Sequence, residues 1–374
     1  MTGQELHSKT ESETADLIAA DHSAAGLPFV SVLMPVRNEK EFIERSLGSV
    51  LAQNYPHELL EIIVSDGEST DGTLERIDEM AAGSDIPVKV VQNPKKIAPS
   101  ALNVAISHAA GEIFVRVDGH CEIDTDYIAN CVENLTGERA DGVGGPIETI
   151  GTGPQARAIS LAMSSTFGVG GSAFRTVKDR ETYVDTVAFP GYTRQIVERA
   201  GPYNEELVRN QDDEYNYRIR KLGGRILLSP SIRSKYYSRS TFRSLWRQYF
   251  QYGYWKVRVL QMHPKQMSIR QFIPFFFVLS IFILGILSLF FVPGRWILGV
   301  LICTYLAANL VASFIAAGRK IGLIPYISWS FCILHFAYGL GSIAGLVAFR
   351  DRWGESDGAS LSGSQTPNRV PSKS

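Results

Sequence analysis

Three long apolar runs near the C-terminal end constrain this chain more than any other feature of its sequence. They cover residues 272–292, 296–317 and 325–349, and none of them contains Asp, Glu, Lys or Arg. At 1.5 Å per residue, each run is long enough to cross a hydrocarbon core of roughly 30 Å as a helix. Because three such helices are difficult to bury in a soluble core, residues 271–349 are predicted to form three transmembrane helices.

Charge is divided unevenly along the chain, although the formal net charge of its 374 residues is only −1. Residues 231–350 contain 13 Lys and Arg side chains and no Asp or Glu, so the N-terminal part is strongly acidic. This division is typical of a soluble domain that rests on a lipid membrane. The acidity of the N-terminal part argues against nucleic acid as a partner.

The basic segment between the second and third runs, residues 318–322, indicates the orientation in the membrane. Because Lys and Arg concentrate in cytoplasmic loops, the N-terminal domain is expected on the cytoplasmic face of the plasma (inner) membrane, anchored by several spans. Three complete spans would then leave Arg350 and Arg352 on the far side, against the same rule. The third run is therefore either a span or a re-entrant helix, and its orientation stays open.

Residues 28–236 alternate between short apolar strands and amphipathic helices. Strands are expected at residues 29–36, 60–65, 88–91 and 113–117, with helices at 41–53, 72–82 and 99–110 between them. This alternation predicts an α/β domain with a mostly parallel central sheet and with ligands at the carboxyl ends of its strands. The polar, aperiodic residues 1–27 and 350–374 are expected to be disordered tails.

Four polar clusters lie at the ends of these elements: residues 37–39, 65–73, 118–120 and 210–214. In the second cluster, Asp66 could bind a uracil edge or a ribose, although Asp66 and Asp71 also suit the capping of the helix that follows. In the third, Asp118 and His120 could hold Mn²⁺ or Mg²⁺ on a diphosphate, or simply form a polar turn. Neither pattern is specific when taken alone.

The fourth cluster places three acids in a row, Asp212, Asp213 and Glu214, just before a predicted helix. One of them could be a catalytic base, since a hydroxyl must lose a proton when it attacks an activated sugar carbon. The alternative is a solvated helix N-terminus whose acids complement the helix dipole. If the helix begins near Asp213, Asp212 lies at its edge and faces the cleft.

Taken in order, these motifs resemble glycosyltransferase family 2, the inverting enzymes with a nucleotide-sugar-binding GT-A type fold. The resemblance covers residues 29–232 and is carried by Val32–Glu39, Ile63–Thr73, Ala101–Asn103, Gly111–Asp118 and the acceptor half between Phe189 and Gly223. Within the family, Phe167–Gly170 and Gln248–Lys256 are similar to the membrane-attached succinoglycan-type exopolysaccharide glucosyltransferases.

The resemblance implies roles for individual residues of this sequence. Asp66 would bind the uracil or its ribose, Asp118 would hold a divalent metal through the diphosphate, and Asp212 would be the general base. His120 stands where the family has a second metal-binding Asp, and Gln211 stands where it has a Glu. The remaining implied contacts are Pro35, Arg37 and Glu39 in the nucleotide pocket, and Asp213, Glu214 and Arg218 on the acceptor side.

Residues 237–270, between the α/β domain and the first apolar run, combine aromatic and basic side chains. Thr241 can cap a helix that runs to about Leu260. One face of this helix would be apolar and aromatic, and a second stripe would contain Arg243, Arg247 and Arg258. This pattern predicts an interfacial helix at the lipid surface. A helix that simply packs on the catalytic domain is the alternative.

The sequence as a whole predicts a membrane-bound, metal-dependent, inverting glycosyltransferase. It would transfer a sugar, with glucose as the first candidate, from a UDP-sugar to a polyprenyl-diphosphate-linked saccharide in exopolysaccharide or cell-surface glycan synthesis. The alternatives are a subunit of a processive polysaccharide synthase and a non-catalytic membrane scaffold that binds nucleotide sugar. Nothing in the sequence indicates an oligomeric state.

Overall fold

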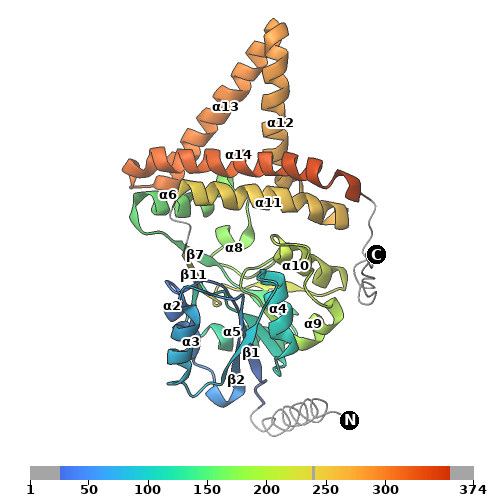
Figure 1. Cartoon of the computed structure of the whole chain (residues 1–374). Coiled ribbons are helices and arrows are strands. Elements are labelled where there is room, and N and C mark those ends of the chain that lie inside the picture. The colour runs from blue at the N-terminus through green and yellow to red at the C-terminus, as the bar shows by residue number, and fades with distance from the viewer. Residues whose placement is uncertain (1–25, 238–240, 354–374) are drawn as a thin grey trace, which may run out of the picture.

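The protein is described here by a computed structural model, which covers residues 26–237 and 241–353. An α/β domain lies beneath a layer of helices, and a helical hairpin stands on that layer (Figure 1). The predicted disordered tails, residues 1–27 and 350–374, fall almost entirely outside the described residues.

The central sheet has eight strands in the order β3-β2-β1-β4-β9-β6-β10-β8. Strands β3, β2, β1 and β4 are parallel, whereas β9 runs antiparallel to both β4 and β6. In chain order these strands are β1 (Val30–Val36), β2 (Leu60–Asp66), β3 (Val88–Gln92), β4 (Ile113–Arg116), β6 (Gly142–Gly144), β8 (Thr182–Tyr183), β9 (Gly191–Thr193) and β10 (Ile226–Leu228). A smaller sheet pairs β5 (Cys121–Ile123), β11 (Ser234–Tyr237) and β7 (Ile147–Ile150). The predicted mostly parallel sheet is confirmed.

Helices cover both faces of the central sheet. Successive side chains of a strand point to opposite faces, so the apolar side chains of β1 contact helices on both. On β1, Val32 and Met34 pack in the same cluster as Ile43 and Leu47 of α2, whereas Leu33 packs with residues of α4, α9 and α10. The helices of this domain are α2 (Ile43–Leu51), α3 (Thr73–Ala81), α4 (Ala98–Ser107), α5 (Tyr127–Thr136), α9 (Arg194–Ala200) and α10 (Gln211–Lys221), with a short 3-10 helix, η2 (His57–Leu59).

The helical layer joins elements that are far apart in the sequence. It contains α6 (Gly153–Met163), α7 (Thr166–Val169), α8 (Ala173–Thr176), α11 (Phe242–Met262) and α14 (Ile324–Ala348), with the 3-10 helices η3 (Pro264–Gln266), η4 (Ile321–Leu323) and η5 (Arg350–Arg352). The predicted cap of α11 is present, since the hydroxyl of Thr241 accepts a hydrogen bond of 3.2 Å from the backbone N–H of Ser244. This helix lies between α14 and the α/β domain (Figure 1).

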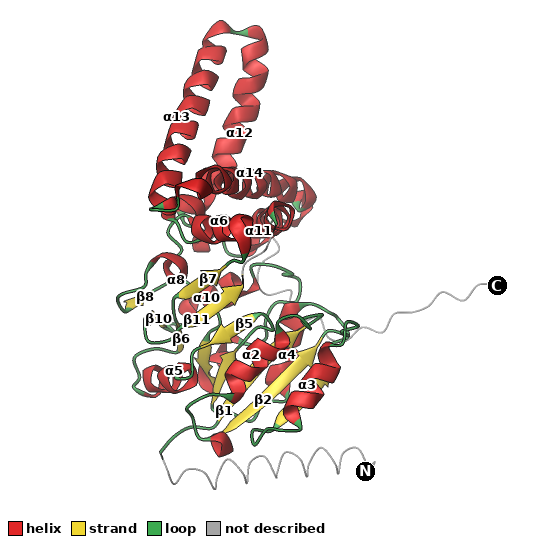
Figure 2. Cartoon of the chain, turned by 90° about the vertical axis from the view of Figure 1, so that its left-hand side faces the viewer, coloured by secondary structure: helices red, strands yellow, loops and turns green. Residues whose placement is uncertain are grey.

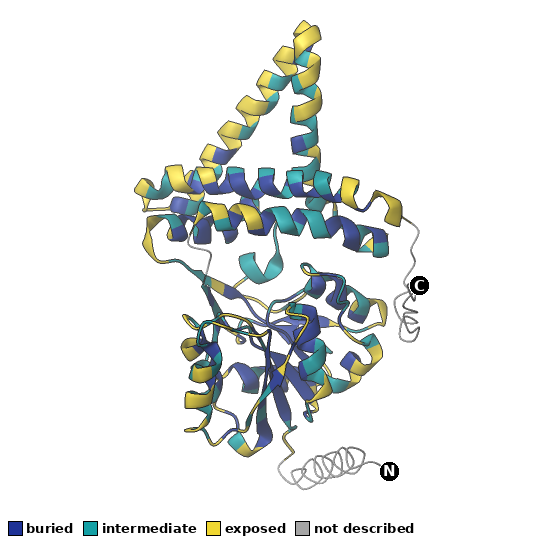
Figure 3. Cartoon of the chain, in the orientation of Figure 1, coloured by how far each residue is buried: buried dark blue, intermediate teal, exposed yellow. Residues whose placement is uncertain are grey.

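The three apolar runs form three helices long and apolar enough to cross a membrane. Two of them, α12 (Ile269–Phe290) and α13 (Val292–Ala317), make a hairpin that projects away from the α/β domain. The third, α14, runs across the foot of this hairpin, and two perpendicular views agree on that direction (Figures 1 and 2). Figure 3 shows exposed residues along most of the hairpin, whereas α14 is largely buried or half-buried.

Glycines allow α11 and α14 to pack backbone against backbone. A Cβ atom added at Gly253 of α11 would lie 2.0 Å from the carbonyl oxygen of Tyr338, and one at Gly341 of α14 would lie 2.1 Å from that of Phe250. Small residues of this kind permit the close approach of helices. The direction of α14 is therefore fixed by its contact with α11.

The end of α14 lies on the same side as the α/β domain. Arg352 forms an ion pair with Glu206 of that domain, and Arg258 of α11 donates to the same carboxylate at 2.7 Å. Arg352 therefore lies beside the α/β domain, and the orientation of the third run in a membrane stays a prediction. Length and hydropathy indicate that a helix could cross a membrane, but they do not indicate how the helix is oriented relative to the rest of the protein.

Candidate active site

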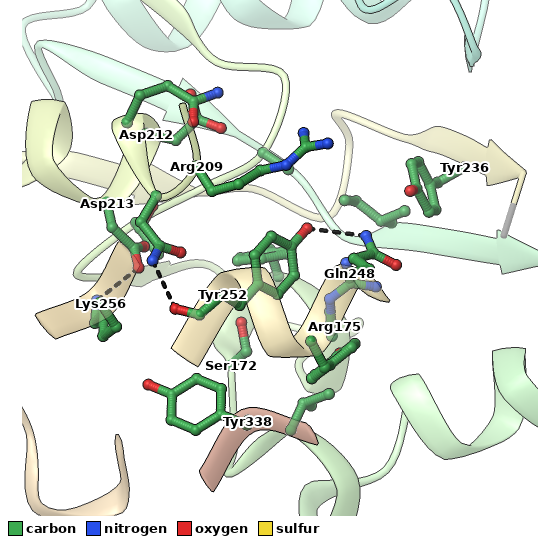
Figure 4. A pocket seen from close by; sticks show the side chains of 18 of the residues that line it. Ser172, Arg175, Arg209, Asp212, Asp213, Tyr236, Gln248, Tyr252, Lys256 and Tyr338 are labelled. Carbon is green, nitrogen blue, oxygen red and sulfur yellow. Dashed lines mark hydrogen bonds and ion pairs between the residues drawn. The ribbon is translucent and has the colours of Figure 1, made fainter. Parts of the chain in front are cut away.

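A cavity of about 880 Å³ connects the carboxyl ends of the parallel strands with the helical layer. Its first end is lined by residues at the end of β1 and after β1 and β3, including Pro35, Arg37 and Lys96. Its second end is lined by side chains of α7, α11, α12 and α14 (Figure 4). We call these two parts the strand-side half and the membrane-side half.

Arg116, the last residue of β4, joins two of the predicted functional acids where the halves meet. Its Nε lies 2.6 Å from Oδ1 of Asp118 and its Nη2 lies 3.0 Å from Oδ2, so the pair is bidentate. Its Nη1 also donates to Oδ1 of Asp212. The side chain of Arg116 is only 8% exposed, whereas that of Asp212 is 37% exposed towards the cavity.

The surroundings change the protonation of this cluster. Burial by itself lowers the pKa of the Arg116 guanidinium, but the charges of Asp118 and Asp212 together raise it well above its ordinary value. Burial raises the pKa of the Asp212 carboxyl, and the negative charge of Asp118 adds to that effect, so the contact with Arg116 is outweighed. An Asp with a raised pKa is a better proton acceptor than an ordinary surface Asp.

The residues predicted to hold a metal, Asp118 and His120, both line the cavity. Nδ1 of His120 lies 2.9 Å from Oε1 of Glu39, and a carboxylate at one ring nitrogen is the usual support for a histidine whose other nitrogen binds metal. Among the described residues, no group of three His, Cys, Asp or Glu could hold an ion by itself. These two residues therefore suit a metal only if a ligand such as a diphosphate supplies further oxygen atoms.

Four residues besides Asp118 are predicted to contact the nucleotide. Three of them line the cavity: Pro35, Arg37 and Glu39. Asp66, the last residue of β2, does not line the cavity and is fully buried. Its carboxylate accepts bonds of 2.6 Å from the Ser69 hydroxyl and 3.0 Å from the Ser69 N–H, so it holds the turn after β2. Asp71, by contrast, accepts a 3.1 Å bond from the N–H of Thr73 at the start of α3, as expected of a capping residue.

The predicted start of the acidic helix is wrong by two residues. Helix α10 begins at Gln211, because Asn210 adopts a left-handed conformation with φ of 62° and donates to the carbonyl of Tyr252. Asp212 is therefore inside the first turn, but it still faces the cavity. Gln211 lines the cavity beside it and is 6% exposed.

The other acidic residues of α10 hold the domain to the helical layer. Asp213 lines the cavity and pairs with Nζ of Lys256 in α11 at 2.8 Å. Glu214 is buried between Arg218, at 2.6 Å, and His263, at 3.1 Å. Neither Glu214 nor Arg218 lines the cavity, so the structure gives these two predicted acceptor-side residues a packing role.

Several cavity residues were missed by the sequence analysis: Arg116, Arg175, Arg209, Lys256 and Arg270. An arginine between two valines in a buried strand was a usable signal for Arg116. The other four come from separate helices and loops. Lys256 ends the motif Gln248–Lys256, and the remaining three lie in stretches without a distinctive pattern. Only the tertiary fold brings them together.

The two short motifs that resemble the succinoglycan-type enzymes, Phe167–Gly170 and Gln248–Lys256, both contribute to the wall of the membrane-side half. Phe167 of α7 packs edge-on against Phe331 of α14, with ring centroids 4.9 Å apart, and its carbonyl oxygen lies 2.8 Å from Nε2 of His335. Gln248, Tyr252 and Lys256, one turn of α11 apart, also line this half of the cavity (Figure 4). The motifs therefore connect the α/β domain with the apolar helices.

Comparison with known proteins agrees with this arrangement. Residues 31–201 match glycosyl transferase family 2. A dolichyl N-acetyl-alpha-D-glucosaminyl phosphate 3-beta-D-2,3-diacetamido-2,3-dideoxy-beta-D-glucuronosyltransferase of Methanococcus voltae is 30% identical over 274 residues, which cover 71% of this chain and 84% of the relative. The succinoglycan biosynthesis protein ExoA of Rhizobium meliloti is 28% identical over 328 residues, which cover 86% and 96%.

Among solved structures, a mannosyltransferase of Pyrobaculum calidifontis in complex with GDP-Man and Mn²⁺ has the same fold. The superposition has a TM-score of 0.55 and 21% sequence identity, and it covers 86% of this chain and 87% of the other. The GT-A type fold is thus shared along most of the chain. Together with the family match and the extended similarity to both relatives, these findings establish that the chain belongs to glycosyltransferase family 2.

Proposed function

We propose that this membrane glycosyltransferase moves a sugar, with glucose as the first candidate, from a UDP-sugar to a polyprenyl-diphosphate-linked saccharide, with inversion at the anomeric carbon. The observation that supports this most strongly is the continuous cavity, which links Asp212 and Asp118 to the apolar helices. A water-soluble donor can enter the strand-side half, while an acceptor anchored in lipid can reach the same acids from the membrane-side half.

In this proposal Asp212 is the general base. Among the described residues, Arg116 donates a hydrogen bond to Oδ1 of its carboxylate. Oδ2 therefore remains available to take the proton from the acceptor hydroxyl. The raised pKa of Asp212 suits that task. Attack from the face opposite the leaving diphosphate gives a single displacement, and a single displacement inverts the anomeric carbon.

On the donor side, Asp118 and His120 would hold a divalent ion, Mn²⁺ or Mg²⁺, together with the diphosphate oxygens of the donor. Bound there, the ion would supply positive charge that offsets the negative charge of the departing nucleoside diphosphate. Arg37 lines this end of the cavity and adds a second positive charge for the phosphates. The Mn²⁺ bound to the Pyrobaculum mannosyltransferase supports a metal in this fold.

We further propose that the α12–α13 hairpin crosses the plasma membrane, while α14 and α11 lie in the plane of its cytoplasmic face. At 1.5 Å per residue, the 22 residues of α12 reach about 33 Å, enough for the hydrocarbon core. Two spans would keep the catalytic domain, the loop at residues 318–322 and Arg350 on one side, and leave only Arg295 at the far turn. This arrangement satisfies the positive-inside rule, which three spans violate.

Cysteine labelling in intact cells tests this topology, because a membrane-impermeant maleimide reaches only the outer side. Arg295→Cys should be labelled, and Arg350→Cys should be labelled only after the cells are opened. The native cysteines are replaced by serine in both variants. Labelling of Arg350→Cys in intact cells would instead indicate three complete spans.

The transfer reaction itself is tested with the full-length protein in nanodiscs. It is incubated with UDP-glucose, other UDP-sugars or GDP-mannose and with a polyprenyl-diphosphate saccharide, and the lipid products are read by mass spectrometry and their anomeric configuration by NMR. One added β-linked hexose from an α-linked UDP-hexose is the expected product. A ladder of added sugars would indicate a processive synthase, and donor binding without any product would indicate a scaffold.

A further inference from the structure

The positively charged side chains of the cavity differ in whether an acid neutralises them. Lys256 pairs with Asp213 at 2.8 Å, and Arg270 pairs with Asp185 at 2.7 Å. Arg175 and Arg209 also line the cavity, yet within the described part of the chain neither guanidinium lies within ion-pair distance of a carboxylate. The membrane-side half therefore contains two arginines whose charge is not balanced.

The neutral contacts of these two arginines hold them in place and leave donor groups free. Nε of Arg209 donates to the side chain of Gln251 in α11 at 3.2 Å, and Nη1 of Arg175 lies 3.5 Å from the hydroxyl of Thr149. Arg175 also lies over the rings of Phe174 and Tyr236. Figure 4 shows both arginines among the side chains that line the pocket. An arginine fork of this kind matches a phosphate group.

Gln248 provides an independent sign that a polar ligand binds here. Its side chain lines the cavity and is only 9% exposed. Its Nε2 donates to the hydroxyl of Tyr252 at 2.9 Å, whereas its Oε1 is buried without a hydrogen-bond partner among the described residues. A buried acceptor left unpaired costs free energy, so a ligand hydroxyl at this position would remove the penalty.

An apolar wall continues from these polar groups towards the hairpin. Ile273, Pro274 and Phe277 of α12 line the cavity, and Ile273 is 61% exposed at the foot of the hairpin. A ligand that fits this sequence of contacts has a hydroxyl-rich part, then one or two phosphates, then a hydrocarbon chain. That order is the chemical structure of a lipid-linked saccharide.

We propose that Arg175 and Arg209 bind the phosphate groups of the lipid-linked acceptor, with the first units of its hydrocarbon chain lying against the start of α12. This inference rests on the proposed function and adds the residues that select the acceptor. It assigns the phosphates of the two substrates to different cations, with Arg37 and the Asp118 site serving the donor. The acceptor would then be recognised by its lipid phosphate as well as by its sugar.

The test compares two acceptors that carry the same saccharide, one on a polyprenyl diphosphate and one on a neutral alkyl glycoside. Full-length Arg175→Gln and Arg209→Gln are assayed in nanodiscs with saturating UDP-sugar. Arg220→Gln, which removes an exposed arginine of α10 outside the cavity, is the matched control. For each cavity variant we expect kcat/KM on the diphosphate acceptor to fall roughly 10- to 100-fold, with less than about a threefold change on the neutral acceptor.

Three results would overturn the inference. Equal losses on both acceptors would show that the arginines do not recognise phosphate of the acceptor. An equal loss of UDP affinity, measured by calorimetry, would assign them to the donor instead. Discrimination that appears only when the nanodisc contains phosphatidylglycerol would assign the site to a phospholipid head group. If the unmodified enzyme transfers sugar to no lipid-linked acceptor, the proposed function itself fails, which is a different outcome.

Discussion

The strand-side half of the cavity is built from loops that follow neighbouring parallel strands, whereas the membrane-side half is assembled from α7, α8, α11, α12 and α14. In the first half, residues such as Arg37 and Asp118 are placed by the register of β1 and β4. In the second, Arg175 and Gln248 meet only because the helical layer docks on the sheet domain. The proposed nucleotide site depends on one sheet, while the proposed acceptor site depends on how two parts of the protein fit together. Changes in acceptor specificity are therefore expected to arise in the helical layer.

The largest expected effect lies where the two halves meet, at Asp212. Asp212→Asn removes the basicity of the side chain and preserves its shape, so sugar transfer should slow by on the order of 10²–10⁴ while donor binding stays nearly unchanged. Single-turnover transfer beside UDP calorimetry measures both quantities. A variant that retains more than about a tenth of the native rate would mean that another residue accepts the proton.

Arg116→Gln should have the next largest effect, because it leaves the carboxylates of Asp118 and Asp212 close together without their common cation. Because both acids are partly exposed, losing these charged hydrogen bonds should lower the free energy of unfolding by roughly 1.5–3 kcal/mol. Since Arg116 lowers the pKa of Asp212, its loss raises that pKa further. The acid limb of the pH–rate profile should then move to higher pH, because the base stays protonated over a wider range.

Arg116→Lys is the matched control, since it retains the charge and loses only the bidentate geometry. Its acid limb should lie between those of the native enzyme and Arg116→Gln. If Arg116→Gln transfers sugar with an unchanged pH profile, the electrostatic link between these groups is absent.

A smaller effect is expected at Asp66, near the strand-side end of the cavity. Asp66→Ala should weaken UDP binding by roughly 1.5–3 kcal/mol, through loss of either a base contact or the Ser69 turn. Ser69→Ala tests the second route, because it removes the 2.6 Å hydroxyl bond of the turn while the Asp66 carboxylate stays in place. A small effect of Ser69→Ala together with a large effect of Asp66→Ala would favour direct contact with the nucleotide. Unchanged UDP affinity in Asp66→Ala would remove this residue from donor binding.

The smallest expected effect belongs to Asp213, which ties α10 to α11. Asp213→Asn keeps a hydrogen-bond acceptor for Lys256 but removes the charge, so stability should fall by roughly 0.5–1.5 kcal/mol in thermal unfolding. UDP affinity should not change, because the pair belongs to the membrane-side half. Weaker UDP binding in this variant would show that the two halves are energetically coupled.

The same contrast explains how much of the protein could be predicted from its sequence. The strands β1 to β4 and the helices between them agree with the predictions to within three residues, because apolar periodicity is a local signal. Asp118 and His120 follow β4 and line the cavity, since polar residues at strand ends converge, and Asp212 lines it from the first turn of α10; their roles stay predictions.

Other features could not be predicted because they depend on contacts between distant segments. The role of Glu214 depends on its contact with His263, which lies in a distant segment of the chain. The direction of α14 depends on the close approach at Gly253 and Gly341. No periodicity encodes such contacts.

We propose that the lipid-linked acceptor enters the membrane-side half of the cavity along α12. A photo-crosslinking residue at Ile273, which lines the cavity, tests it directly when compared with one at Ile315, which lies exposed on α13 outside the cavity. Both variants are irradiated in nanodiscs with UDP and the polyprenyl-diphosphate saccharide. Capture of the acceptor is expected at Ile273, with little capture at Ile315. Equal capture at both positions, or none at Ile273 in a variant that still transfers sugar, would contradict it.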